Sequence, residues 1–158
     1  MTAPTARVLV TGASGFIGVR LTAALERTRD YALLRASRRP RQGEPGWVVF
    51  DADDPRTFDA ALEGVTVAYW LVHGMAEGHG YLERELASAR AFAKAAAAAG
   101  VERIVYLGGL EPSGTISEHL QSRLATGRAL SEGTVPVIEL RASVILGPGS
   151  EEIGRAHV

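Results

Sequence analysis

Three glycines near the start of the chain have a spacing that suits the binding of phosphate groups. The segment Gly12-Ala-Ser-Gly15-Phe-Ile-Gly18 follows the apolar run Arg7–Thr11 and precedes an amphipathic stretch. Gly12 allows a sharp turn, Gly15 lets backbone approach a pyrophosphate, and Gly18 lets a helix lie close to a sheet. The first amides of that helix add a partial positive charge. The pattern predicts a turn that holds a dinucleotide, and an ordinary strand-to-helix turn is the alternative.

A basic segment, Ser37-Arg38-Arg39-Pro40-Arg41, follows the next apolar run. In a dinucleotide-binding sheet this position lies beside the adenosine ribose. An acidic residue there binds the hydroxyls of NAD, whereas arginine accommodates the 2′-phosphate of NADP. Guanidinium groups match phosphate oxygens. We therefore expect Ser37, Arg38 and Arg39 to favour NADP, with NAD possible; a solvated basic turn is the alternative.

Two acidic segments follow the third apolar run. Asp51 is placed to accept a hydrogen bond from the adenine amino group, and Ala52 to offer its backbone to the ring. The next residues, Asp53-Asp54-Pro55, are typical of a helix cap.

Histidines follow the fourth apolar run. Ligands of parallel sheets gather beyond the carboxyl ends of the strands, so Leu71, Val72 and His73 border the expected site. His73 could contact ribose or substrate. Together with His79 it has no well-spaced acidic partner, so no metal site is expected. A loop with incidental histidines is the alternative.

The elements that must position these residues alternate between strands and helices. The expected strands are Arg7–Thr11, Tyr31–Ser37, Trp47–Asp51, Val65–Val72, Arg103–Leu107 and Val137–Arg141; the expected helices are Phe16–Arg29, Pro55–Leu62, Tyr81–Ala99 and Glu118–Ser131. The alternation predicts a doubly wound α/β fold, a parallel sheet of about six strands with helices on both faces. The unbroken apolar run Val65–Val72 predicts a strand buried on both sides.

Composition excludes several classes of protein. The 158 residues suffice for one domain, and the net charge of −1 argues against a general binder of nucleic acids or membrane surfaces. The absence of cysteine excludes disulfides, a thiolate nucleophile and cysteine metal sites. No signal peptide or membrane span is apparent, so we expect a cytoplasmic protein.

Four segments resemble, in their order, those of extended and atypical short-chain dehydrogenases/reductases. They are TGASGFIG, LVHGM, RIVYLGGL and LRASVILGPGS. The resemblance is greatest to NmrA-like and nucleoside-diphosphate-sugar-epimerase-like NAD(P)-binding proteins. It implies a Rossmann fold with NAD(P) across the strand tips. The expected cofactor contacts are Gly12, Ser14, Gly15, Phe16, Ile17, Gly18, Ser37, Arg38, Arg39, Asp51, Ala52, Leu71, Val72 and His73.

The catalytic pattern departs from that family. Its active members carry tyrosine and, four residues later, lysine as YxxSK; the tyrosine exchanges a proton, and the lysine lowers its pKa and holds the ribose. Here the matching helix reads His119-Leu-Gln-Ser122-Arg123. His119 could act as acid or base with Arg123 positioning the ribose, in an atypical oxidoreductase for an unidentified small molecule. The alternative is a non-catalytic NADP-binding redox sensor, regulatory or assembly protein. Ser113 and Ser122 are further candidate hydrogen-bond donors to substrate.

The residues after Ser150 do not continue the family pattern. The segment Glu152–Val158 can be back-translated into the start of a sequencing adapter. We therefore expect residues 1–150 to form the NAD(P)-binding Rossmann domain and residues 151–158 to be a non-native tail. The substrate region of a longer natural protein is expected to be missing.

Overall fold

A computed structural model describes residues 6–28, 30–72, 80–110, 117–143 and 145–148. His73, His79, Ser113 and the expected tail lie outside these residues. The elements are β1 (Arg7–Val10), α1 (Phe16–Thr28), β2 (Ala32–Ser37), β3 (Trp47–Val49), the 3₁₀ turn η1 (Pro55–Thr57), α2 (Phe58–Leu62), β4 (Val67–Trp70), α3 (Tyr81–Ala98), β5 (Arg103–Gly109), α4 (Glu118–Ser131) and β6 (Val137–Ala142).

The strands form one sheet in the order β3-β2-β1-β4-β5-β6, and every neighbouring pair is parallel. This arrangement confirms the predicted doubly wound α/β fold. The chain reverses its direction across the sheet between β1 and β4. Ligands of such sheets bind beyond the carboxyl ends of the strands at this switch point.

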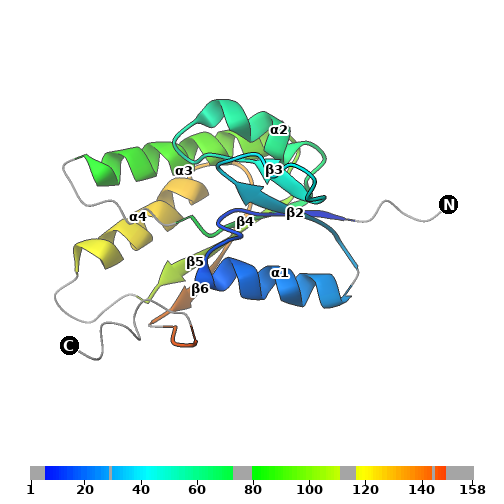
Figure 1. The fold of residues 1–158 in the computed structure, drawn as a ribbon. Helices are drawn as coiled ribbons and strands as arrows, with labels where there is room; N and C mark the ends of the chain where they lie inside the picture. Colours follow the sequence, from blue (N-terminus) through cyan, green and yellow to red (C-terminus); the bar gives the residue numbers. More distant parts are fainter. Residues whose placement is uncertain (1–5, 29, 73–79, 111–116, 144, 149–158) are drawn as a thin grey trace.

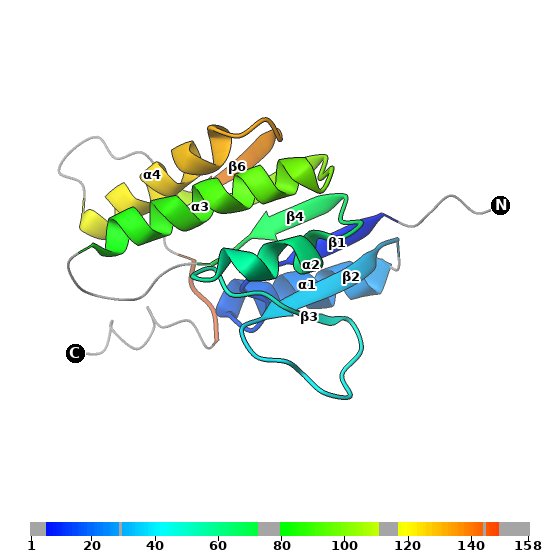
Figure 2. The same ribbon diagram turned by 90° about the horizontal axis from the view of Figure 1, so that it is seen from above.

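The helices are divided unequally between the two faces of the sheet. Figure 1 shows α2, α3 and α4 together on one face and α1 on the other, and Figure 2 gives the same arrangement from above. Right-handed crossovers explain the division. The step from β1 to β2 runs in one direction across the sheet, whereas the steps that carry α2, α3 and α4 run in the other.

The larger core lies between the sheet and these three helices. Its centre is an aromatic cluster in which Phe50 stacks on Phe58 at 4.8 Å between ring centroids and Trp70 meets Phe92 at 4.7 Å. All four rings are buried. Such aromatic pairs contribute more than their buried area alone.

The opposite face has a smaller core, in which Val8 and Val10 of β1 pack near Leu21 and Leu25 of α1. The prediction that β4 is buried on both sides is wrong on this face. Alternate residues of the strand are only half-buried there, because α1 is the only helix that the described residues place on that face.

Most expected elements agree with the structure to within two residues, and α4 has the bounds that were predicted. The expected helix Pro55–Leu62 is instead a 3₁₀ turn followed by α2. Asp54 caps this turn as predicted: its side chain accepts a hydrogen bond from the amide of Arg56. The hydrogen bond from the Arg56 side chain lowers the pKa of the Asp54 carboxyl. None of the described helices has the length and apolar character that crossing a bilayer requires.

Phe92 tests the importance of the aromatic cluster. Phe92→Ala empties the centre of the cluster and is expected to lower the free energy of unfolding by about 3–5 kcal/mol. Leu82→Ala, on the same helix but 38% exposed, is the control and should change it by less than about 1 kcal/mol. Urea unfolding followed by circular dichroism measures both; similar losses in the two variants would contradict this account of the core.

Candidate dinucleotide site

The glycine turn between β1 and α1 is too closely packed to accept a side chain at Gly12 or Gly18. Gly12 has a φ of +64°, and a Cβ there would lie 2.8 Å from the carbonyl oxygen of Leu71. A Cβ on Gly18 would overlap the carbonyl oxygen of Gly12 and lie 2.7 Å from the Cα of Ala13. The turn therefore exposes backbone at the carboxyl edge of the sheet, immediately before the first amides of α1. Backbone of this kind can approach phosphate groups closely.

Thr11 joins this turn to the end of β4. Its hydroxyl donates to the carbonyl of Tyr69 at 2.9 Å and accepts from the amide of Leu71 at 3.0 Å. Its own amide also donates to the carbonyl of Tyr69. Thr11 is fully buried, so these bonds are shielded from water. They place the half-buried Leu71 and Val72 beside the turn; sequence reasoning had treated Thr11 only as the end of a strand.

Two other expected contacts begin α1, and a third lies within the turn. Phe16 and Ile17 are half-buried, and Ser14 is exposed. The guanidinium of Arg20 lies 3.9 Å from the centre of the Phe16 ring and donates to the carbonyl of Pro148 at 2.6 Å. These contacts bring the chain after β6 back to the start of α1.

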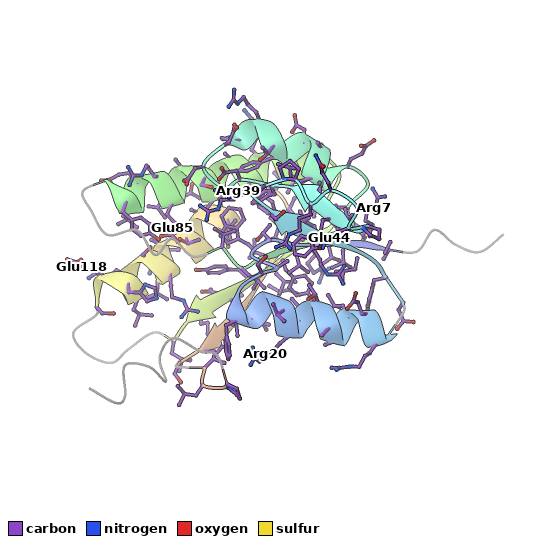
Figure 3. All side chains as sticks on the ribbon, in the orientation of Figure 1. Arg7, Arg20, Arg39, Glu44, Glu85 and Glu118 are labelled. Carbon is purple, nitrogen blue, oxygen red and sulfur yellow. The ribbon has the colours of Figure 1, made fainter. Side chains whose placement is uncertain are left out.

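A pocket of about 780 Å³ opens at the end of β2. Its lining consists of Ser37, Arg38, Arg39, Pro40, Arg41, Gln42, Glu44 and Asp51. The hydroxyl of Ser37 donates to the carbonyl of Arg39 at 2.6 Å and so closes the turn after β2. Arg38 and Arg39 are exposed, and Figure 3 labels Arg39 among the side chains drawn on the ribbon.

Arg41 is the arginine of this pocket with the most contacts in the described structure. Its guanidinium lies 4.0 Å from the centre of the Trp47 ring and donates to the hydroxyl of Ser14 at 3.3 Å. It also lies 3.7 Å from a carboxylate oxygen of Glu44. Arg41 therefore links the β2–β3 loop to the glycine turn. The basic run in the sequence contains it, but its stacking on Trp47 is visible only in the fold.

Asp51 lines this pocket, and Ala52 follows it in the chain. Asp51 is half-buried, and one of its carboxylate oxygens accepts a hydrogen bond from the amide of Asp53 at 3.1 Å. The carbonyl of Ala52 accepts a hydrogen bond from the hydroxyl of Ser88 on α3. The hydroxyl of Ser88 thus holds the backbone of Ala52 in place. The Asp51 carboxylate can still accept further hydrogen bonds from a ligand.

The two candidate catalytic residues on α4 lie in different surroundings. His119 is exposed on the first turn of the helix. Arg123 is half-buried and donates to the carbonyls of Leu107 and Gly108, both at 3.1 Å, at the end of β5. The guanidinium of Arg123 thus closes the carboxyl end of this strand. Its Nε is buried and has no hydrogen-bond partner among the described residues.

Two tyrosines and a glutamate surround this part of α4, and sequence reasoning missed all three. The fully buried Tyr106 donates its hydroxyl proton to the carbonyl of Arg123 at 2.8 Å, and burial raises its pKa. Glu85 of α3, labelled in Figure 3, accepts a hydrogen bond from the buried hydroxyl of Ser122. Burial and a hydrogen bond with Glu85 raise the pKa of Tyr81. Both phenols therefore stay protonated near neutral pH.

Within the described part of the chain, no three His, Cys, Asp or Glu side chains gather closely enough to hold a metal ion. The exposed backbone of the glycine turn and the arginines of the pocket are groups that can bind phosphates.

Residues 12–130 match a family of proteins described as NAD(P)H-binding. The matched span contains the glycine turn, the arginine pocket and the His119–Arg123 segment. No curated protein matches the chain.

Several solved structures share the fold. The triphenylmethane reductase of Citrobacter sp. complexed with NADP(H) has a TM-score of 0.73 at 21% identity, over 95% of this chain and 54% of its own. A short-chain dehydrogenase/reductase superfamily protein from Agrobacterium tumefaciens with bound NAD has a TM-score of 0.70 at 23% identity, over 85% and 48%. A nucleoside-diphosphate-sugar epimerase from Staphylococcus aureus has a TM-score of 0.69 at 17% identity, over 85% of this chain and 50% of its own. The chain thus spans about half the length of these proteins.

The family match and the shared fold confirm the resemblance that the sequence segments indicate. At these identities the solved structures show the fold alone. The roles of individual site residues stay predictions.

Two glycine substitutions separate the packing of the turn from its ligand contacts. Gly18→Ala forces a methyl group against the backbone of Gly12 and Ala13, and we expect it to lower the free energy of unfolding by about 1–3 kcal/mol. Among the described residues, a Cβ on Gly15 meets only the carbonyl oxygen of Gly12, at 3.2 Å, so Gly15→Ala should destabilise the fold less. It should still weaken NADPH binding, because the methyl group occupies the approach of the phosphates. Urea unfolding and fluorescence titration with NADPH measure the two effects; unchanged NADPH binding by folded Gly15→Ala protein would contradict the assignment.

Proposed function

The chain belongs to the NAD(P)H-binding family, and from that premise we propose that it forms the cofactor-binding domain of an atypical NADP-dependent oxidoreductase acting on a small molecule. The observation that carries the proposal is the glycine turn, whose backbone leaves no room for a Cβ at Gly12 or Gly18, beside a pocket lined by arginines. When bound, NADP supplies or accepts a hydride at its nicotinamide ring. The chain's own residues bind and orient it.

The residues at the carboxyl edge of the sheet fit a dinucleotide that lies across the strand ends in one orientation. The turn around Gly15 and the start of α1 receive the pyrophosphate. The pocket between Arg41 and Asp51 receives the adenosine half, because it lies at the ends of β2 and β3. The nicotinamide half then extends toward the ends of β4 and β5, near Val72 and the first turns of α4. Thr11 keeps the turn at a fixed distance from β4 through the two hydrogen bonds of its hydroxyl.

The proposed preference for NADP over NAD rests on the segment after β2, which carries three arginines and no acidic residue at the tip of the strand. Arg38 and Arg39 follow the strand directly, and Arg41 is held against Trp47 with its guanidinium directed to Ser14. A guanidinium that is already oriented loses less conformational freedom when it binds a phosphate dianion. Arg41 is accordingly the strongest single candidate for the 2′-phosphate contact.

Substitution of these arginines tests the preference. Arg41→Ala and the double variant Arg38→Ala/Arg39→Ala are each expected to weaken NADPH binding about tenfold or more, because a hydrogen bond to a charged group is lost. NADH, which has no 2′-phosphate, should be affected much less. Arg84→Ala, an exposed position on α3, is the control. Fluorescence titration with both cofactors measures the ratio; equal weakening of NADH and NADPH would contradict the phosphate assignment.

A second candidate function is a redox sensor, or a regulatory or assembly protein, that binds NADP without turnover. Arg123 favours it, because the guanidinium at the lysine position of YxxSK already binds the carbonyls of Leu107 and Gly108. Nearby, Tyr106 directs its proton to a backbone carbonyl. Under the first candidate, the exposed His119, which stands at the tyrosine position of YxxSK, exchanges the proton with the substrate.

Arg123→Met separates these two functions. If Arg123 serves the end of β5, the variant removes two charge-assisted hydrogen bonds to the carbonyls of this strand and loses about 1–3 kcal/mol of unfolding free energy. Its affinity for NADPH should then stay close to that of the wild type. A large loss of NADPH affinity at unchanged stability would instead show that Arg123 contacts the cofactor. NADPH consumption with a panel of carbonyl compounds completes the test: consumption that His119→Gln abolishes supports the enzyme, and binding without consumption supports the sensor.

A further inference from the structure

The arginine pocket at the end of β2 contains an acidic side chain, Glu44, next to Arg41. A tight turn places it there: the amide of Glu44 donates to the carbonyl of Arg41 at 3.4 Å, and Gly43 has a φ of +78°. A positive φ at the third position of such a turn favours glycine. The segment Arg41-Gln-Gly-Glu44 therefore returns Glu44, labelled in Figure 3, to the lining of the pocket.

The carboxylate of Glu44 and the guanidinium of Arg41 form a loose ion pair. Nη1 of Arg41 lies 3.7 Å from Oε2 of Glu44, which is longer than a hydrogen bond. The side chains are 38% exposed for Arg41 and 54% for Glu44. Exposed pairs of this kind are weak, because water screens the charges and two long side chains lose conformational freedom. A ligand of higher charge can therefore take the place of this carboxylate.

Two other contacts hold the guanidinium of Arg41 without the help of Glu44. Its Cζ lies 4.0 Å from the centre of the Trp47 ring, and Nη2 donates to the hydroxyl of Ser14 at 3.3 Å. Nη1 is the nitrogen that faces Glu44. A phosphate that binds the guanidinium through Nη1 thus meets the carboxylate of Glu44 at the same position.

The charges of the pocket lining single out the same residue. The lining contains the arginines 38, 39 and 41 and two acids, Glu44 and Asp51. In the described part of the chain, Glu44 is the one of these two acids that forms an ion pair with an arginine of the lining. Loss of its charge would leave a more positive pocket in which Arg41 has lost its anionic neighbour.

We propose that Glu44 is a specificity-determining residue, whose carboxylate competes with the 2′-phosphate of NADP for the guanidinium of Arg41. This role rests on the proposed function, in which the pocket receives the adenosine half of the cofactor. A phosphate monoester carries about 1.5 to 2 negative charges at neutral pH and displaces the single charge of Glu44. NADH has no phosphate there, so its binding leaves the ion pair intact. Glu44 thereby narrows the preference for NADP and lets the same pocket accept NAD.

Glu44→Gln tests the competition, because it removes the charge and keeps the size of the side chain. We expect NADPH to bind this variant about two- to fivefold more tightly than the wild type, the range of a weak exposed ion pair, and NADH to change by less than about 1.5-fold. Glu132→Gln is the matched control. It makes the same change in net charge and breaks an exposed ion pair with Arg90, but Glu132 follows α4 and lies outside the lining of the arginine pocket. Fluorescence titration measures the dissociation constants.

The double variant Arg41→Ala/Glu44→Gln shows whether Glu44 acts through Arg41. If carboxylate and phosphate compete for this guanidinium, Glu44→Gln should change NADPH affinity by less than about 1.5-fold once Arg41 is absent. A full gain of NADPH affinity in that background would overturn the proposal. An equal gain for NADH and NADPH in Glu44→Gln, or a gain of the same size in Glu132→Gln, would overturn it too.

The single variant Arg41→Ala separates a failure of this proposal from a failure of the proposed function. Selective weakening of NADPH by Arg41→Ala, together with no gain in Glu44→Gln, would overturn the role of Glu44 and retain Arg41 as the phosphate contact. Equal weakening of both cofactors by Arg41→Ala, or no binding of either cofactor by the wild type, would overturn both.

Discussion

The close packing of the glycine turn against the end of β4 is the constraint on which the rest of the site depends. Gly12 passes so near Leu71 that a side chain at the turn would strike a backbone carbonyl, and Gly18 brings α1 equally near the turn. Thr11 fixes this arrangement through hydrogen bonds that are shielded from water. A looser turn would move the first amides of α1 away from the switch point. The phosphate binding that we propose there rests on backbone geometry and needs no charged side chain.

The polar residues around the turn divide the carboxyl edge of the sheet into two halves. Toward β2 and β3, Arg41 and its neighbours form a basic pocket that suits a phosphorylated nucleotide. Toward β5, Arg123 and Tyr106 are occupied with backbone carbonyls. The half that would recognise the cofactor therefore has several groups that can bind a phosphate. The half that would perform chemistry has an exposed histidine in place of a tyrosine. This asymmetry suits both an oxidoreductase that uses His119 and a sensor that binds NADP without turnover.

The fold could be predicted from the sequence because each of its signals is local. Glycine spacing, apolar runs and caps such as Asp54 act within a few residues, and the strand order follows once the first strand, turn and helix are identified. The contacts of the candidate site are not local. The stacking of Arg41 on Trp47 depends on the path of a loop, and the bond between Ser122 and Glu85 joins side chains 37 positions apart. The role of Thr11 depends on β4 lying beside β1, so a reading of Arg7–Thr11 alone shows only a strand.

In the proposed complex the glycine turn holds the pyrophosphate of NADP. Titration of the isotope-labelled chain with NADP⁺, followed by the chemical shifts of its backbone amides, tests this contact. We expect saturable shifts that are largest for the amides from Ser14 to Gly18, with further shifts at Arg38, Arg39 and Arg41 that NAD⁺ reproduces only in part. Saturable binding that leaves the amides of the glycine turn unmoved, or no binding of either cofactor, would contradict it.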